Sequence, residues 1–274
     1  MCLHGFMGRA TDWDDFSKFF SRDNPGWQIV MLELPGHGDA VKGFRCPDAQ
    51  EFAAMLVDLV KGEGWERAAL CGYSLGGRLA LNAALSHPHV FPIFIGVSTA
   101  AGISEESVRV ARCASDALLV ERLRGLRGDA EFAGFLREWW RLPIFESPLR
   151  DAPGMHKFLT SRIGRRPADL AECLWQWSPG RILPEWDRLG AYSGAALLVS
   201  GAVDIKYSEM ALRMASVFAN GEAVVLGGGG HRVPAELPEK LARTVSDFLA
   251  VKRVLPDAPG FVVSSACGTN LRKS

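Results

Sequence analysis

A serine enclosed by glycines is the feature of this sequence best suited to chemistry. The run Gly72-Tyr73-Ser74-Leu75-Gly76 follows an apolar stretch and precedes a segment with helical periodicity. So tight a strand-to-helix turn needs small residues two positions before and after the serine. The hydroxyl then projects at a helix N-terminus, where the helix dipole and free N–H groups favour negative charge. This spacing predicts that Ser74 is the reactive group of an enzyme.

Activation of that hydroxyl requires a neighbour that removes its proton. Of the six histidines, His231 alone comes after the last strand-like run, directly behind a run of glycines. Asp204 comes directly after an earlier apolar run, where a carboxylate can accept from the histidine and hold its tautomer. Glu209 and Asp187 are the alternatives for that role. The chain order serine, acid, histidine is the order of one hydrolase class, so Ser74, Asp204 and His231 are the predicted catalytic residues.

The elements that must position these residues alternate between strand and helix. Strand-like runs cover residues 27–34, 67–73, 90–97, 195–200 and 222–226, and helical periodicity covers 47–61, 75–86 and 238–252. Strands that alternate with helices imply an α/β fold, with a mostly parallel central sheet covered by helices on both faces.

The remaining segments divide the chain. Residues 1–101 and 191–252 are predicted to form the α/β core, and residues 102–190, helical without strand runs, an inserted helical lid. Residues 253–274 are expected to be a loose C-terminal tail. Residues 1–4 look like the end of a strand, and folds of this class usually place further strands before it. The first strands are therefore expected to be missing.

Two further features surround the serine. The loop His4-Gly5-Phe6 follows the first strand fragment, so the backbone N–H groups of Phe6 and Leu75 are predicted to form an oxyanion hole. Arg78 lies one helical turn after Ser74 on the same face, where a guanidinium would hold an anion beside the hydroxyl. His4 and His37 are interpreted as structural loop histidines.

The composition excludes several classes of protein. The 274 residues include 31 basic and 31 acidic side chains, so no net charge favours a nucleic-acid partner. The six cysteines form no CxxC pair, so neither a disulfide framework nor a zinc site is expected. No signal peptide or apolar run of about 18 residues is present, which predicts a cytoplasmic protein without membrane contact. No metal or cofactor is expected, and the chain is predicted to be a monomer or weak homo-oligomer.

Several motifs together resemble one known family. They are LHGFMG with the following Asp12-Trp13, LELPGHG, CGYSLGGRLAL, ARCASD, EWWRLPIFES, SGAVDIKY and GGGGH. Over roughly residues 3–235 the chain is similar to the 2-succinyl-6-hydroxy-2,4-cyclohexadiene-1-carboxylate synthases of menaquinone biosynthesis, a branch of the α/β-hydrolase superfamily. GGGGH is richer in glycine than the AGH associated with this family.

The resemblance implies an α/β-hydrolase fold and an elimination rather than a hydrolysis. Such enzymes release pyruvate from 2-succinyl-5-enolpyruvyl-6-hydroxy-3-cyclohexene-1-carboxylate, and the triad serine acts as a base. This small-molecule substrate carries three carboxylates, which suit arginine ligands. By matching position, the resemblance assigns substrate binding to Arg78, Arg112, Arg162, Tyr73 and Trp139.

Two other functions remain open from the residues alone. A serine carboxylesterase or carbon–carbon bond hydrolase acting on another acidic substrate would use Ser74 to form an acyl-enzyme. A binding module on a disabled hydrolase scaffold would need none of the three catalytic side chains, and their presence argues against it. Arg78 separates the first alternative from generic esterases, because neutral esters have no use for it.

Overall fold

The computed structural model describes residues 1–38, 44–150 and 152–252. Within these ranges a six-stranded sheet forms the centre of the molecule, in the order β2-β1-β3-β4-β5-β6, and every neighbouring pair is parallel. The strands are β1 Cys2–Leu3, β2 Met31–Leu32, β3 Ala69–Tyr73, β4 Ile93–Val97, β5 Ala195–Gly201 and β6 Gly221–Leu226. The predicted α/β class with a mostly parallel sheet is confirmed.

The helices of the described ranges fall before, between and after these strands. They are α1 Asp14–Asp23, α2 Ala49–Gly62, α3 Leu75–Ser86, α4 Glu106–Gly125, α5 Gly128–Trp140, α6 Ala152–Thr160, α7 Pro167–Gln176, α8 Trp186–Leu189, α9 Ile205–Val217, α10 Val233–Glu236 and α11 Pro238–Val251, with 3₁₀ turns η1 Ala10–Trp13 and η2 Pro143–Phe145. Among them, none combines the length and the apolar character needed to span a bilayer.

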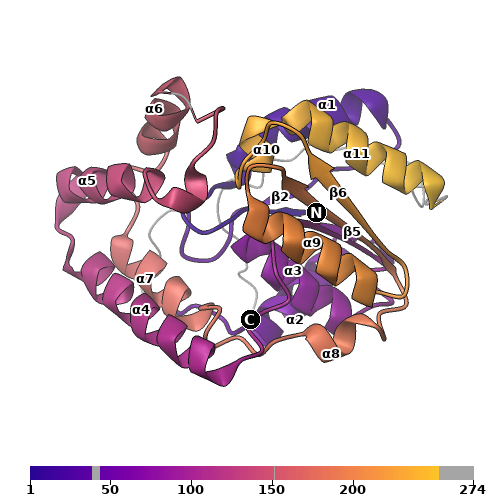
Figure 1. Ribbon diagram of the computed structural model, residues 1–274, viewed down its shortest axis with the longest axis horizontal. Coiled ribbons are helices and arrows are strands. Elements are labelled where there is room, and N and C mark those ends of the chain that lie inside the picture. The colour runs from indigo at the N-terminus through magenta and orange to yellow at the C-terminus, as the bar shows by residue number, and fades with distance from the viewer. Residues whose placement is uncertain (39–43, 151, 253–274) are drawn as a thin grey trace.

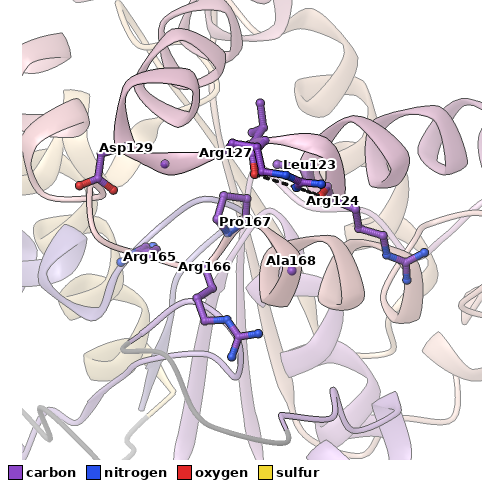
Figure 2. Close-up of a pocket in the computed structure, with 10 residues that line it drawn as sticks. Leu123, Arg124, Arg127, Asp129, Arg165, Arg166, Pro167 and Ala168 are labelled. Atoms are coloured by element: carbon purple, nitrogen blue, oxygen red, sulfur yellow. Dashed lines mark hydrogen bonds between the residues drawn. The ribbon is translucent and has the colours of Figure 1, made fainter.

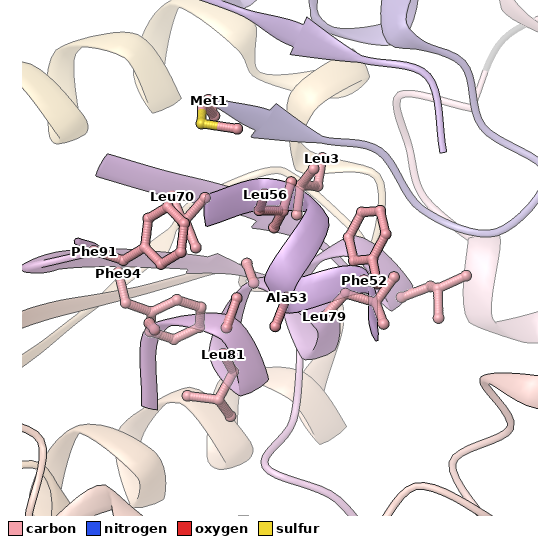
Figure 3. Close-up of a cluster of buried hydrophobic side chains, with 14 of the residues drawn as sticks. Met1, Leu3, Phe52, Ala53, Leu56, Leu70, Leu79, Leu81, Phe91 and Phe94 are labelled. Carbon is pink, nitrogen blue, oxygen red and sulfur yellow. The ribbon is translucent and has the colours of Figure 1, made fainter. Parts of the chain in front are cut away.

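Helices cover both faces of the sheet (Figure 1). On one face α2, α3 and α9 enclose a core that includes Phe52, Leu79 and Phe94, part of which is drawn in Figure 3. On the other face α1 and α11 pack together over a second core, which contains Phe16 and Phe248. Because both faces are buried, the central strands are apolar throughout, and β4 and β5 are buried at every residue.

Local signals account for the helices that were predicted. Asp48 caps α2 by accepting hydrogen bonds from the backbone N–H groups of Gln50 and Glu51, and the Glu51 side chain completes a capping box. Helix α3 covers the predicted residues 75–86. Helices α1 and α9 have no counterpart among the predicted elements. In α1 only one narrow face is buried, through Phe16, Ser17 and Phe20, within a mostly charged segment.

The helical segment between β4 and β5 has a small core of its own. Helices α4 to α7 lie beyond one end of the sheet in Figure 1. Their cluster joins Leu123, Phe132 and Leu170 to Met7, which belongs to the loop after β1. The division into core and lid stays a prediction. The predicted tail 253–274 lies outside the described residues.

Candidate active site

The turn at Ser74 is as tight as its glycines predict. Ser74 has φ +51° and ψ −111°, a left-handed conformation that L-residues rarely adopt. A Cβ atom on Gly72 would lie 2.4 Å from the carbonyl oxygen of Gly76, and a Cβ atom on Gly76 would lie 2.4 Å from the carbonyl oxygen of His4. Neither position has room for a side chain, so both glycines are required for the turn that presents Ser74 at the start of α3.

A chain of hydrogen bonds joins the three predicted catalytic side chains. His231 Nε2 lies 3.2 Å from Ser74 Oγ, and His231 Nδ1 lies 2.6 Å from Asp204 Oδ2. The imidazole is 1% exposed. With the carboxylate accepting from Nδ1–H, Nε2 carries the lone pair that can receive the serine proton. The geometry therefore allows Ser74 to act as a base or as a nucleophile.

The loops after β5 and β6 hold the acid and the histidine in place. Asp204 caps α9, and its Oδ1 accepts from the Tyr207 N–H at 3.4 Å while Oδ2 faces the imidazole. The Val203 N–H donates to the Gly229 carbonyl at 2.9 Å, which ties the two loops together. The Gly230 N–H donates to Glu236 Oε2 at 2.6 Å. These bonds fix the backbone on both sides of the imidazole.

Glu236 also reaches the helical insertion. The Ser147 hydroxyl, in the segment after η2, donates to the same Oε2 at 3.0 Å. The carboxylate thus joins the loop that carries His231 to the segment between β4 and β5.

The predicted oxyanion loop packs against the serine. A Cβ atom on Gly5 would lie 3.4 Å from Ser74 Cβ, so the backbone next to Phe6 runs directly beside the hydroxyl-bearing residue. His4 holds this loop from beneath: Nδ1 lies 2.8 Å from the Gly5 carbonyl oxygen, and Nε2 accepts from the Leu34 N–H at 3.0 Å. Leu75 begins α3, so its N–H has no acceptor within the helix. This placement agrees with the structural interpretation of His4.

Arg78 is partly buried beside the site and has no ion-pair partner in the described residues. Its Nε has no hydrogen-bond partner among them, and no carboxylate of the described ranges lies within ion-pair distance. Burial lowers the pKa of this guanidinium to about 10, and Tyr207 and Asp116 oppose that effect while Arg112 adds to it. The side chain is still a cation at neutral pH, held where an anion would satisfy it.

The other two predicted arginine ligands already have partners. Arg112 Nε donates to both carboxylate oxygens of Asp116 at 2.8 Å, and Asp116 in turn accepts from Ser178. Arg162 is buried, pairs with Asp12, and donates to the Met7 carbonyl oxygen. Arg112 lies close enough to Arg78 to influence its charge, whereas Arg162 holds the loop after β1 to the helical insertion.

Three aromatic rings lie around the imidazole of His231. The rings of Tyr207, Tyr73 and Phe145 lie 4.6, 5.4 and 6.0 Å from that of His231. Trp139 contacts Phe145 at 5.9 Å and Phe6 at 5.5 Å between ring centroids. Burial raises the pKa of the Tyr73 hydroxyl, which stays protonated at neutral pH. Tyr73 and Trp139, predicted from opposite halves of the fold, thus lie around one site.

Sequence reasoning missed three residues at this site. Tyr207 lies three residues after Asp204, one turn into α9, and Phe145 lies in the Pro143-Ile144-Phe145 turn. Arg232 directly follows His231. Their positions beside predicted residues were the available signal, but adjacency alone does not tell which way a side chain points.

A separate cavity of about 200 Å³ lies at the ends of α4, α5 and α7. Its lining includes Arg124, Arg127, Arg165 and Arg166, and none of the three catalytic candidates. In Figure 2 Arg124 and Arg166 point in different directions, and Arg127 turns back to the Arg124 carbonyl. These guanidinium groups do not converge on one point.

The described residues contain no group of three or more His, Cys, Asp or Glu side chains arranged to hold a metal ion. Among them, Cys2, Cys46, Cys71, Cys113 and Cys173 are free thiols.

Comparison with known proteins places this geometry in context. Residues 1–244 match the model of the alpha/beta hydrolase family. The chain is similar to proteins named 2-succinyl-6-hydroxy-2,4-cyclohexadiene-1-carboxylate synthase from Pectobacterium atrosepticum, 28% identical over 91% of this chain and 93% of that one, and from an Enterobacter species, 28% identical over 91% of each.

Among solved structures, MenH from S. aureus superimposes with a TM-score of 0.83 at 24% identity, covering 92% of this chain and 93% of that one. A thermophilic esterase from Thermogutta terrifontis superimposes with a TM-score of 0.71 at 22% identity, covering 91% of this chain and 88% of that one. At these identities both likenesses show the fold alone.

Proposed function

The chain belongs to the α/β-hydrolase family, and we propose that it is a carbon–oxygen lyase of menaquinone biosynthesis. The proposed reaction eliminates pyruvate from 2-succinyl-5-enolpyruvyl-6-hydroxy-3-cyclohexene-1-carboxylate and yields 2-succinyl-6-hydroxy-2,4-cyclohexadiene-1-carboxylate. One observation supports it most: Arg78, whose buried Nε has no partner in the described chain, lies one turn from a serine bonded to a histidine–aspartate pair. The relatives that carry the synthase name match over most of their length.

In the proposed reaction Ser74 removes the ring proton next to the succinyl carbonyl. His231 Nε2 receives the serine proton, and Asp204 stabilises the imidazolium that results. The electron pair of the broken C–H bond forms a new double bond, the ring double bond shifts by one position, and the C–O bond to the enolpyruvyl group breaks. The leaving group departs with the electron pair of the C–O bond and takes up a proton to become pyruvate. No acyl-enzyme forms.

Negative charge that develops on the succinyl carbonyl oxygen would be held by the backbone N–H groups of Phe6 and Leu75. Because Leu75 begins α3, the helix dipole adds to this stabilisation. Gly5, the residue before Phe6, lies against Ser74 Cβ, and this proximity supports the assignment. The same donors would serve a tetrahedral intermediate, so they favour neither elimination nor hydrolysis.

The carboxylates of the substrate are assigned to the arginines. Arg78 takes one without giving up a bond, since its Nε has no partner in the described chain. Arg112 keeps Asp116 and offers its remaining N–H groups. Arg162 would have to exchange Asp12 or the Met7 carbonyl for substrate, so it is the weakest of the three candidates. Tyr73 and Trp139 would line the pocket between them.

The helical segment 102–190 is proposed to act as a lid over the core 1–101 and 191–252. Phe145 meets the imidazole, and Ser147 bonds Glu236 next to the His231 loop. A closed lid would exclude water, which strengthens charge interactions at Ser74.

Pyruvate release by the purified chain tests the proposal directly. A lactate dehydrogenase assay with the cyclohexene substrate should show turnover that Ser74→Ala lowers by about 10³-fold or more. Ser216→Ala, which removes an exposed hydroxyl on α9, should match the wild type. Equal release from wild-type chain and Ser74→Ala would refute the proposal.

The esterase alternative rests on the same serine–histidine geometry and is separated by the product. An esterase would form a covalent fluorophosphonate adduct at Ser74 and turn over simple esters rapidly. Rapid ester turnover without pyruvate release from the cyclohexene substrate would favour that alternative.

A further inference from the structure

Arg232 is a partly buried cation that the proposed mechanism does not use. It directly follows His231, and its guanidinium carbon lies 3.7 Å from the centre of the Trp140 ring. Trp140 ends α5 in the helical insertion and is 4% exposed. The contact therefore joins the histidine loop to the lid. A guanidinium stacked on an indole is held in one plane and keeps its N–H groups free at the edge of that plane.

The donors of Arg232 are not satisfied within the described chain. Nη1 is buried there and has no hydrogen-bond partner. A buried N–H group without an acceptor costs free energy, more so when it is charged. A ligand with acceptor oxygens would remove that cost.

Comparison with other arginines shows that Arg232 is unusual. Buried N–H groups without a hydrogen bond occur in the described chain at Arg9, Arg78, Arg165 and Arg232. Arg9 and Arg165 lie 3.9 and 3.6 Å from carboxylate oxygens of Glu33, so each has a carboxylate within ion-pair distance. Arg78 and Arg232 have no such ion pair among the described residues. They share this property, and they lie on the helix after Ser74 and on the loop of His231.

The two cations have different aromatic neighbours at the imidazole. Arg78 interacts with Tyr207 and Arg232 with Tyr73, and both tyrosine rings contact the ring of His231. Burial lowers the pKa of Arg232, as it does for Arg78, while Glu236 and Asp12 favour the charge of Arg232. Neither carboxylate forms an ion pair with Arg232 in the described chain. The site thus has one cation without an ion pair near Tyr207 and another near Tyr73.

We propose that Arg232 is a substrate-binding residue that takes a second carboxylate next to Tyr73, while Arg78 takes the first next to Tyr207. This inference rests on the proposed function for the identity of the substrate. It adds that the site selects ligands with separated carboxylates, because one anion cannot satisfy both cations. The Trp140 stack supplies the orientation, so that the donors of Arg232 are in place when the ligand binds.

Calorimetric titration with two simple acids tests this without turnover. Pentanedioate and pentanoate share one five-carbon chain and differ by one carboxylate. The wild-type chain should bind pentanedioate at least tenfold more tightly, and Arg232→Met should erase most of that difference. Arg232→Lys retains the charge but not the paired donors of the guanidinium. Its selectivity between the two acids should therefore lie between those of the wild type and Arg232→Met. Arg213→Met is the matched control, because Arg213 stacks on Trp186 at 4.1 Å in an exposed position on α9.

Each outcome decides the inference. A wild-type chain that does not distinguish the two acids overturns it, and so does Arg232→Met with wild-type affinity for both. If Arg232→Met fails to fold, Arg232→Gln and Arg232→Lys carry the same comparison, and loss of selectivity in Gln but not in Lys supports the inference. Absence of pyruvate release would refute the proposed reaction but leave the binding result standing, so the two failures can be told apart.

Discussion

Guanidinium groups that are buried or partly buried occur in two regions of this molecule. The regions differ in what balances the charge of these groups. Under the loop after β1, Arg162 and Arg165 meet Asp12, Glu33 and the carbonyl groups of that loop. Beside His231, Arg78 and Arg232 have no carboxylate partner in the described chain. In the first region the arginines have a structural role, and we call it the structural arginine cluster. In the second region the arginines have donors available to an anion.

The difference teaches how to separate structural from functional arginines. A buried cation that the fold itself satisfies contributes to stability, and its removal leaves a carboxylate unpaired. A buried cation that the fold leaves unsatisfied lowers stability, and such a cost is tolerated at functional sites. If this distinction holds, substitutions in the two regions should have opposite profiles in stability and activity.

The largest effect is expected on stability, in the structural arginine cluster. Arg162→Met should destabilise the fold by about 3 kcal/mol, because Asp12 and the Met7 carbonyl lose their donor. In a chain of this size that corresponds to a melting temperature lower by roughly 10 °C, which calorimetry can measure. Arg122→Met is the control, since Arg122 and Glu138 form an exposed pair worth at most about 1 kcal/mol. Equal melting temperatures for the two variants would break the comparison.

The next effect is expected beside the serine. Arg78→Met should lower kcat/KM for pyruvate release by about a hundredfold, or about 2.7 kcal/mol, because a substrate carboxylate loses its partner. Its melting temperature should equal or exceed that of the wild type, since an unsatisfied buried charge is removed. Arg78→Lys should retain part of the activity. A fall in stability with unchanged kinetics would show that Arg78 has a structural role, like Arg162.

The pH dependence of stability sharpens the comparison through Asp12. Burial opposes ionisation of this carboxyl, but Arg162 outweighs it, and the pKa lies below the ordinary value of 3.8. A depressed pKa contributes stability above the unfolded-state pKa and loses it as the pH falls through the folded-state value. Below about pH 4 the wild type should therefore lose stability more steeply than Asp12→Asn in urea titrations. Parallel curves would contradict the role given to the pair.

The smallest effect is expected where the helical insertion contacts the histidine loop. Ser147→Ala removes the bond to Glu236 Oε2 but leaves the Gly230 bond intact. One such bond is worth about 1 kcal/mol, so KM for the cyclohexene substrate should rise about fivefold while kcat changes little. Thr160→Ala breaks only a local bond within α6 and should leave KM unchanged. A fall in kcat instead would place Ser147 in the chemistry rather than in closure.

Much of the fold could be predicted because its signals are local. The glycines around Ser74, the apolar runs of β3 to β6 and the periodicity of α2, α3 and α11 each lie within a few residues of one another. The order of strand and helix then implied a parallel sheet, whose carboxyl ends share one edge. Because these strand ends share an edge, the sequence order alone predicts that Ser74, Asp204 and His231 lie together. Helix α1 was missed because its buried face is narrow and the rest of the segment is charged.

The roles of the arginines could not be predicted in the same way. Arg162 and Arg232 look equally available in the sequence, and the resemblance favoured the first. The structure pairs Arg162 with Asp12, 150 residues away, and stacks Arg232 on Trp140 of α5. Whether a guanidinium is satisfied depends on partners from distant segments, which no spacing rule reports.

By itself, the sequence of this protein determined the reactive turn and the class of sheet that presents it. Both follow from steric and hydrophobic constraints between near neighbours in the chain. Only the tertiary structure decided which cations are balanced, which rings enclose His231, and that Glu236 joins the histidine loop to the helical insertion. The physical reason is that charge balance and ring contacts are made across the fold, so they exist only once remote segments have packed together.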